Sequence, residues 1–196
     1  MMHIIAGATF LFIGWRFGDW KNWKKYYPTI LFFIIGDLLY NVLTYNNPTW
    51  SYNKDRLFPN HTLINIWIMI TIYPATALTY LSHFPKEKVK QLPYILLWTI
   101  IYIFGELLGL HVFGLINHFN GWNMWWSALF DIILFTMLPI HHKRPLVAWG
   151  LSIVVIIFFL FLSHTWQNNF IYYFWILSSF LNHKFLFIAP FSILLS

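Results

Sequence analysis

Cysteine is absent from the 196 residues of this chain. Its absence excludes disulfide bonds, c-type haem attachment, thiolate metal sites and cysteine nucleophiles. The sequence also lacks the His-Glu-x-x-His signature of zinc proteases, the Gly-x-Ser-x-Gly turn of serine hydrolases and a glycine-rich phosphate loop. We therefore expect no catalytic residues, no cofactor and no enzymatic activity, whereas metal binding stays open.

Charged residues are scarce as well. They make up 9% of the chain, against about 25% in a soluble domain, while 59% of the residues are apolar and 22% are aromatic. Water cannot be the main solvent of such a chain. The formal net charge of +6 is carried by short loops between apolar runs, so an anionic membrane surface is the expected partner rather than a nucleic acid.

Six apolar segments can cross a hydrocarbon core about 30 Å thick, which takes roughly 20 helical residues. We place them at residues 2–17, 29–45, 62–82, 92–113, 124–140 and 145–162. The expected fold is an all-α, polytopic transmembrane helical bundle over residues 1–162. Residues 163–196 form an apolar tail broken by polar residues and a proline, and it is open whether they form a seventh span, an interfacial segment or a re-entrant hairpin.

Lysine and arginine alternate between the loops. Residues 16–25, 86–90 and 143–144 together hold nine of them, whereas the intervening loops hold only Lys54 and Arg56. Because basic residues accumulate on the cytoplasmic side of a membrane, this alternation predicts that the amino terminus lies outside. We expect a multi-pass protein of a cell membrane.

Residues 16–28 predict a short interfacial helix, with aromatic residues on one side and lysines mostly on the other. The residues expected to contact lipid headgroups on the cytoplasmic side are Trp20, Lys21, Trp23, Lys24 and Lys25. An aromatic belt with cytoplasmic lysines accounts for the pattern, and a dedicated lipid or partner site is the alternative.

Five prolines lie at two kinds of position in the expected spans. Pro28, Pro93 and Pro145 each follow a basic loop, and we expect each of them to open a span, where its missing N–H costs nothing. Pro74 and Pro139 lie inside spans, where they free a carbonyl group and allow a kink.

Three of the six acidic residues, Asp37, Glu106 and Asp131, lie inside expected spans. An ionised acid at the bilayer centre costs about 2.5 to 3.5 kcal/mol, so these three must face the bundle interior and be paired, protonated or hydrated. No lysine or arginine lies in the middle of the spans, which leaves neutral partners. The residues expected to form this intramembrane polar seam are Asp37, Tyr40, Asn41, Asn65, Tyr102, Glu106 and Asp131.

Acids without a fixed cation tend to hold a proton or a mobile cation. The leading hypothesis is therefore permeation or sensing of a proton, a cation or a small solute along the polar seam. The alternative is a structural or regulatory membrane factor whose acids only organise helix packing. A third and remote alternative is an intramembrane enzyme with Glu106 and Asp131 as an acid pair. Whether the chain forms a homo-oligomer or binds a membrane partner also stays open.

Histidines give a second hint. His61, His111 and His118 are expected near the outer face, where imidazole together with carboxylate suits zinc or another divalent cation. None of their spacings is a metal-ligand motif. A hydrated interfacial role is the competing interpretation.

Two motifs carry a family resemblance. Residues 16–28 read Arg-Phe-Gly-Asp-Trp-Lys-Asn-Trp-Lys-Lys-Tyr-Tyr-Pro, and residues 36–41 read Gly-Asp-Leu-Leu-Tyr-Asn. With these motifs the chain resembles a family of small uncharacterised multi-pass membrane proteins from Bacillus- and Clostridium-like bacteria, over about the first 160 residues. The resemblance implies a bacterial cytoplasmic membrane but no activity and no site residues.

Overall fold

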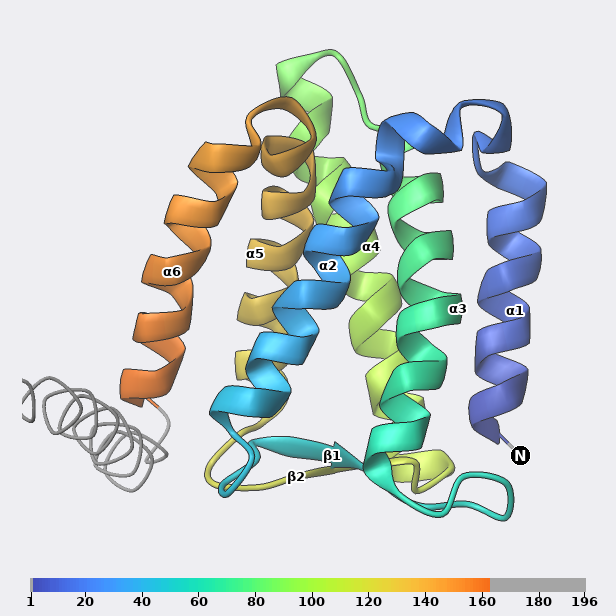
Figure 1. The fold of residues 1–196 in the computed structure, drawn as a ribbon, viewed down its shortest axis with the longest axis vertical. Helices are drawn as coiled ribbons and strands as arrows, with labels where there is room; N and C mark the ends of the chain where they lie inside the picture. The colour runs from blue at the N-terminus through green and yellow to red at the C-terminus, as the bar shows by residue number, and fades with distance from the viewer. Residues whose placement is uncertain (1, 163–196) are drawn as a thin grey trace, which may run out of the picture.

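Six helices follow one another along the chain, as the apolar segments predict (Figure 1). The computed structural model describes residues 2–162, and helices make up 77% of it. The helices are α1 (Met2–Phe17), α2 (Trp23–Leu43), α3 (His61–Ser82), α4 (Lys88–Leu107), α5 (Met124–Lys143) and α6 (Pro145–Leu162). The expected all-α class is confirmed, and the expected tail at residues 163–196 lies outside the described residues.

Four helical segments are long and apolar enough to cross a membrane. They are Trp20–Leu43, His61–Ser82, Lys88–Val112 and Met124–Lys143. Two shorter apolar helices, Met2–Phe17 and Pro145–Leu160, flank them in the sequence. By length and composition, the chain is therefore built as a membrane protein.

Asparagine caps mark the start of α3 and α5. The Asn60 side-chain oxygen accepts a hydrogen bond from the backbone N–H of Leu63 at 2.9 Å. Asn123 accepts from the N–H groups of Trp125 and Trp126 at 3.0 and 3.4 Å. An uncapped helix leaves its first N–H groups without partners, so these contacts define where the two helices begin.

The expected role of two prolines is wrong. Pro145 opens α6 as expected, but Pro28 and Pro93 lie inside α2 and α4, each at the sixth position of its helix. A proline inside a helix removes the bond to the carbonyl group four residues earlier. Those carbonyls belong to Lys24 and Val89, which are exposed residues, so solvent or headgroups can satisfy them.

The prediction of a separate interfacial helix at residues 16–28 is also wrong. The chain makes a single 3₁₀ turn at Trp20–Asn22 and passes directly into α2. Asp19 fixes this turn by accepting hydrogen bonds from the Asn22 side chain at 3.0 Å and from the Tyr26 hydroxyl at 3.2 Å. The bond from Asn22 lowers the pKa of Asp19.

The other helices pack around α3 and α5. Helix α3 contacts α1 and α2, while α5 contacts α2, α4 and α6. The Tyr80 hydroxyl donates to the Phe135 carbonyl at 2.6 Å, which joins α3 to α5 in the middle of the hydrophobic core. On the far side of α3, Gly7, Gly14 and Gly18 bring α1 into close contact.

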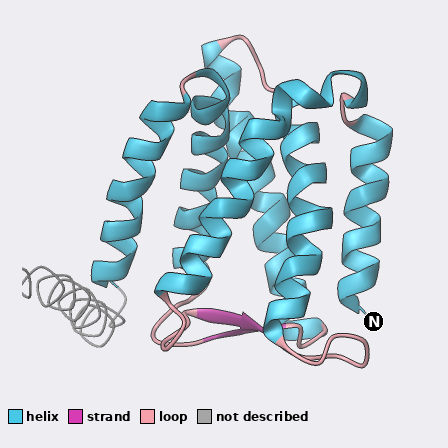
Figure 2. Cartoon of the chain, in the orientation of Figure 1, coloured by secondary structure: helices cyan, strands magenta, loops and turns pink. Residues whose placement is uncertain are grey.

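A two-stranded ribbon closes one end of the bundle (Figure 2). Helix α4 ends in a π-helical turn, Leu108–Val112, before the chain forms β2 (Ile116–His118). Strand β2 pairs antiparallel with β1 (Trp50–Tyr52), so that Trp50 lies opposite His118 and Tyr52 opposite Ile116. The ribbon thus joins the connection between α2 and α3 to the connection between α4 and α5.

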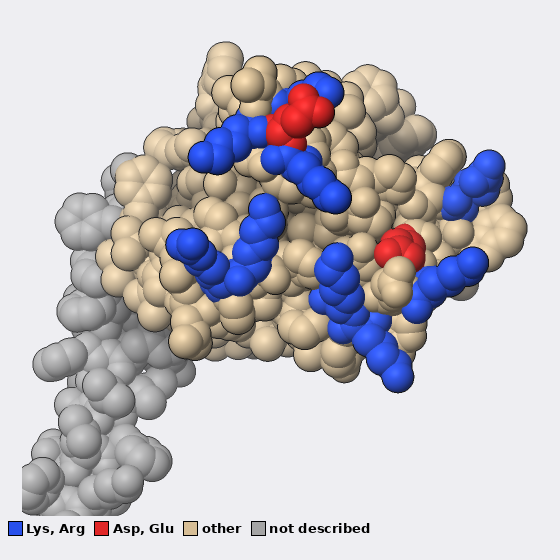
Figure 3. Space-filling view, turned by 90° about the horizontal axis from the view of Figure 1, so that it is seen from above, with Lys and Arg blue, Asp and Glu red and all other residues tan. Residues whose placement is uncertain are grey.

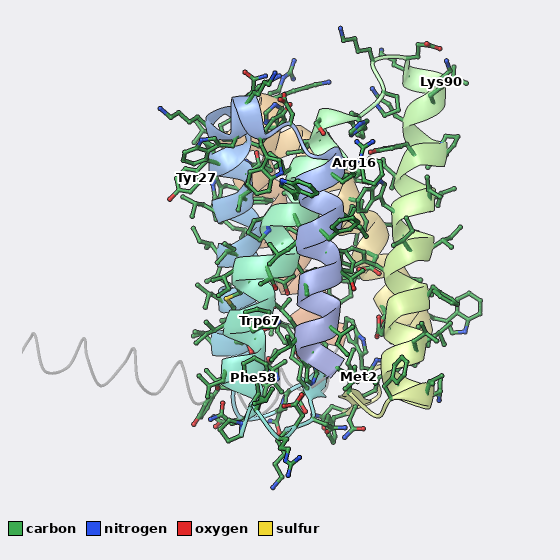
Figure 4. All side chains as sticks on the ribbon, turned by 90° about the vertical axis from the view of Figure 1, so that its right-hand side faces the viewer. Met2, Arg16, Tyr27, Phe58, Trp67 and Lys90 are labelled. Carbon is green, nitrogen blue, oxygen red and sulfur yellow. The ribbon has the colours of Figure 1, made fainter. Side chains whose placement is uncertain are left out.

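The opposite end of the bundle is basic (Figure 3). It is formed by the α1–α2, α3–α4 and α5–α6 connections and the adjoining helix ends, which hold all the lysines and arginines of residues 2–162 except Lys54 and Arg56. Figure 4 shows Arg16 and Lys90 at this end, and Met2 and Phe58 near the ribbon end. The charge alternation of the sequence thus becomes a difference between the two ends of the bundle.

Candidate functional site

The polar residues of the bundle form two clusters. The Asp37 cluster consists of Asp37, Asn41, His61, Asn65 and Tyr73 on α2 and α3. The Glu106 cluster consists of Glu106, His118, Trp122, Ser127 and Asp131 on α4, β2, α5 and the loop between the last two. The expected single seam is thus divided in two.

Asp37 is surrounded by neutral hydrogen-bond donors. It is 9% exposed, and its Oδ2 accepts from the Asn65 side chain at 2.6 Å and from the Asn41 side chain at 3.3 Å. Its Oδ1 accepts from the Tyr73 hydroxyl at 3.1 Å. Three donors without a cation can hold a carboxylate in an apolar interior, because each bond offsets part of the cost of removing it from water.

A directed chain of hydrogen bonds leads to the same carboxylate. The backbone N–H of Tyr52 donates to His61 Nδ1 at 3.0 Å, so the ring proton of a neutral His61 is on Nε2. That nitrogen donates to Asn41 Oδ1 at 2.9 Å, and the Asn41 amide donates onward to Asp37. Every donor points toward Asp37, which stabilises its negative charge.

Helical spacing brings these side chains together. Asp37 and Asn41 are four residues apart on α2. His61, Asn65 and Tyr73 follow one face of α3 at intervals of four and eight residues. The expected seam omitted Tyr73, although its spacing from Asn65 places the two on one face.

Glu106 accepts two short hydrogen bonds at the ribbon end of the bundle. Its Oε1 lies 2.6 Å from His118 Nε2 and 2.6 Å from the Ser127 hydroxyl oxygen. The Ser127 oxygen accepts from the indole N–H of Trp122 at 2.8 Å, which leaves the Ser127 hydrogen for Glu106. Both contacts therefore meet at one oxygen of the Glu106 side chain.

Asp131 is a buried acid with an unpartnered carboxyl oxygen within residues 2–162. It is 7% exposed, and within the described residues its Oδ2 has no hydrogen-bond partner. It lies one turn beyond Ser127 on α5, close enough to Glu106 for the two carboxylates to repel each other when both are ionised. Thr99, which faces the interior from α4, also has an unpartnered hydroxyl group.

Tyr52 connects the two clusters. Burial raises the pKa of its phenol well above the usual range, and the charges of Asp37 and Glu106 raise it further. Its ring stacks on His61 with the ring centres 5.4 Å apart. Strand β1 therefore contacts the Asp37 cluster directly and reaches the Glu106 cluster through its pairing with β2.

Two residues of the expected seam have other partners. The Tyr40 hydroxyl accepts from the backbone N–H groups of Thr49 and Trp50, both at 3.1 Å, and so holds the loop before β1. The Tyr102 hydroxyl bonds Thr76 at 2.7 Å and joins α4 to α3. These contacts stabilise the loop and the helix pair rather than an acid.

The three histidines expected at the outer face do not meet. His61 belongs to the Asp37 cluster, His118 belongs to the Glu106 cluster, and His111 is exposed on the π-helical turn. Between residues 2 and 162, no three histidine or acidic side chains are grouped closely enough to hold a metal ion.

The residues expected at lipid headgroups are accessible. Lys21, Lys24 and Lys25 are exposed, as are Trp20 and Trp23 at 44% and 43%. They lie at the basic end, around the turn that joins α1 to α2. Their position suits an anionic membrane surface.

Comparisons with known proteins give no lead to a function. A scan of protein-family models, a search of curated proteins and a search of solved structures each found no match. The resemblance of residues 16–28 and 36–41 to a bacterial membrane family stays a prediction.

Proposed function

We propose that this chain crosses a bacterial cell membrane six times with its amino terminus outside. Four helices have the length and composition of spans, and the shorter α1 and α6 pack against α3 and α5. Six crossings bring all three strongly basic connections to one side, which the positive-inside rule makes the cytoplasmic side. The partners of that end are anionic headgroups around Trp20, Lys21, Trp23, Lys24 and Lys25.

Cysteine labelling tests this orientation on a background that has no cysteine. Asn120→Cys lies in the exposed turn after β2, and Lys88→Cys lies at the exposed start of α4. A membrane-impermeant thiol reagent added to intact cells is expected to label N120C and not K88C. Labelling of K88C alone would invert the orientation, and labelling of neither before lysis would show that residue 120 is not outside.

We further propose that the protein binds a proton, a cation or a small solute at its buried acids, in order to conduct it or to sense it. The observation that carries this proposal is the unpaired, buried carboxyl group of Asp131 beside Glu106. A carboxylate kept only for packing would have donors around it, as Asp37 has. Asp131 stays inside the bundle without such partners, which suits an acid that gains and loses a ligand.

Flux measurements on purified protein in liposomes test the function. Wild-type protein is expected to pass protons, a cation or a small solute down an imposed gradient, and Asp131→Asn is expected to reduce the flux to that of empty liposomes. The free energy of unfolding should fall less in D131N than in Asp37→Asn, because D131N loses no hydrogen bond. A folded wild type with no flux, and with a stability that no pH or cation changes through Asp131, would overturn the proposal.

A structural or regulatory role is the second candidate, and the Asp37 cluster favours it. There the acid joins α2 to α3 through Asn65 and Tyr73, which is how polar residues hold helices together in a membrane. Under this candidate, Asp131 would be a neutral acid that fills space. The liposome experiment separates the two, because a packing residue gives no dependence of flux on Asp131.

A further inference from the structure

We propose that the ligand of Asp131 is a proton, which enters from the ribbon end through His118 and Glu106. This assignment rests on the proposed function and adds to it both the chemical species and the route. It follows from three features of the Glu106 cluster: a histidine at its outer edge, a carboxylate in contact with that histidine, and an unpaired acid deeper in the bundle.

Asp131, at the end of the route, is less exposed than the two groups that precede it. The side chains of His118 and Glu106 are 14% and 20% exposed, whereas Asp131 is buried among α4, α5 and their neighbours. His118 lies on β2, where its pairing with Trp50 holds it at the end of the bundle. An imidazole in such a place can take a proton from solvent on one ring nitrogen and release another proton from the second.

The proton transfers balance in each step. A proton from solvent binds Nδ1 of neutral His118, and the proton on Nε2 moves across the 2.6 Å contact to Glu106 Oε1. The imidazole is then neutral again, and Glu106 is a carboxylic acid. Glu106 passes this proton to the carboxylate of Asp131 and returns to its ionised state, in which it accepts again from Ser127. His118 now carries its proton on Nδ1, and a flip of the ring turns that N–H toward Glu106 before the next transfer.

The surroundings of Asp131 favour a proton over a metal cation. A metal ion needs several oxygen or nitrogen ligands at once, and the described residues offer no group of three acidic or histidine side chains. Asp131 and Glu106 repel each other when both are ionised, and one bound proton removes this repulsion. The Glu106 oxygen that faces His118 is already occupied by two donors.

The other titratable groups near this site are few. Helix α4 contributes Glu106 and Tyr102, and the ribbon contributes His118 and Tyr52. Helix α6 has no titratable side chain in its sequence. Asp37, on α2, is held by donors of its own. Among residues 2–162, no lysine or arginine side chain acts on Asp131, so none of them neutralises its negative charge.

Infrared spectroscopy and proton uptake together test the route. On the full-length protein in liposomes, the carbonyl stretch of a protonated carboxylic acid is expected in wild type and absent in Asp131→Asn. His118→Gln keeps a donor toward Glu106 but cannot carry a proton, so it should keep this band at equilibrium and slow proton uptake by at least about tenfold. His111→Asn, at an exposed histidine of the neighbouring π-helical turn, should leave the rate unchanged.

Chemical rescue supplies a second readout. Imidazole added on the ribbon side is expected to restore uptake in His118→Gly, because it can replace the missing ring. A wild-type uptake rate in H118Q would overturn the route while leaving Asp131 as the binding residue. A flux of another cation that depends on Asp131 without proton uptake would overturn the choice of ligand, and a flux independent of Asp131 would overturn the proposed function itself.

Discussion

Gly14→Val is expected to separate α1 from α3 and to lower the free energy of unfolding by about 3 kcal/mol or more. A Cβ atom on Gly14 would lie 2.7 Å from the Cβ of Ala75 and 2.9 Å from its Cα. The second of these atoms belongs to the backbone, so no side-chain rotation relieves the clash. In lipid, helices associate through close van der Waals contact rather than through the hydrophobic effect, so a displaced α1 gains nothing in return.

Unfolding of the purified protein in mixed detergent micelles measures this effect. Gly36→Val is the matched control, because Gly36 is helical and a Cβ there meets no atom within 4 Å. It should change the stability by less than about 1 kcal/mol. Equal stabilities of G14V and G36V would show that the contact between α1 and α3 does not depend on the glycine.

Asp37→Asn is expected to destabilise the protein by about 1 to 3 kcal/mol, although it preserves the shape of the side chain. Asn65 and Asn41 reach Asp37 through NH₂ groups, which can only donate. The new NH₂ group at position 37 would face at least one of these donors or require Tyr73 to turn its hydroxyl group around. A buried donor would then lose its acceptor.

Asp131→Asn is the matched control for this second experiment, because it makes the same change at another buried acid. The fold offers Oδ2 of Asp131 no hydrogen bond within residues 2–162, so its loss leaves no donor unpaired. Comparing the two variants by unfolding in the same micelles should show a larger loss for D37N than for D131N. If D131N lost as much stability as D37N, a packing role would be indicated for both acids.

The sequence predicts the helices well because each one is set by local composition. Six apolar runs give six helices at the expected places, four of them long enough to cross a membrane, and Asn60 and Asn123 begin two of the six. Helix starts near proline were harder to predict. Pro28 and Pro93 suit the first turn of a helix, but α2 and α4 extend outward past them, where Lys24 and Val89 are exposed.

Chain composition alone determined that this protein has an apolar exterior, few charges and three acids that must be accommodated inside. Only the tertiary structure decided how each acid is accommodated. Asp37 meets Tyr73 across two helices, and Glu106 meets His118 because β2 returns the chain to the end of α4. Such contacts depend on how helices rotate about their axes and on the path of a loop, and neither follows from the spacing of residues along one helix. In the same way, the sequence showed that Asp131 is costly to bury. Only the packing of α5 against α4 decided that its Oδ2 has no hydrogen-bond partner among residues 2–162.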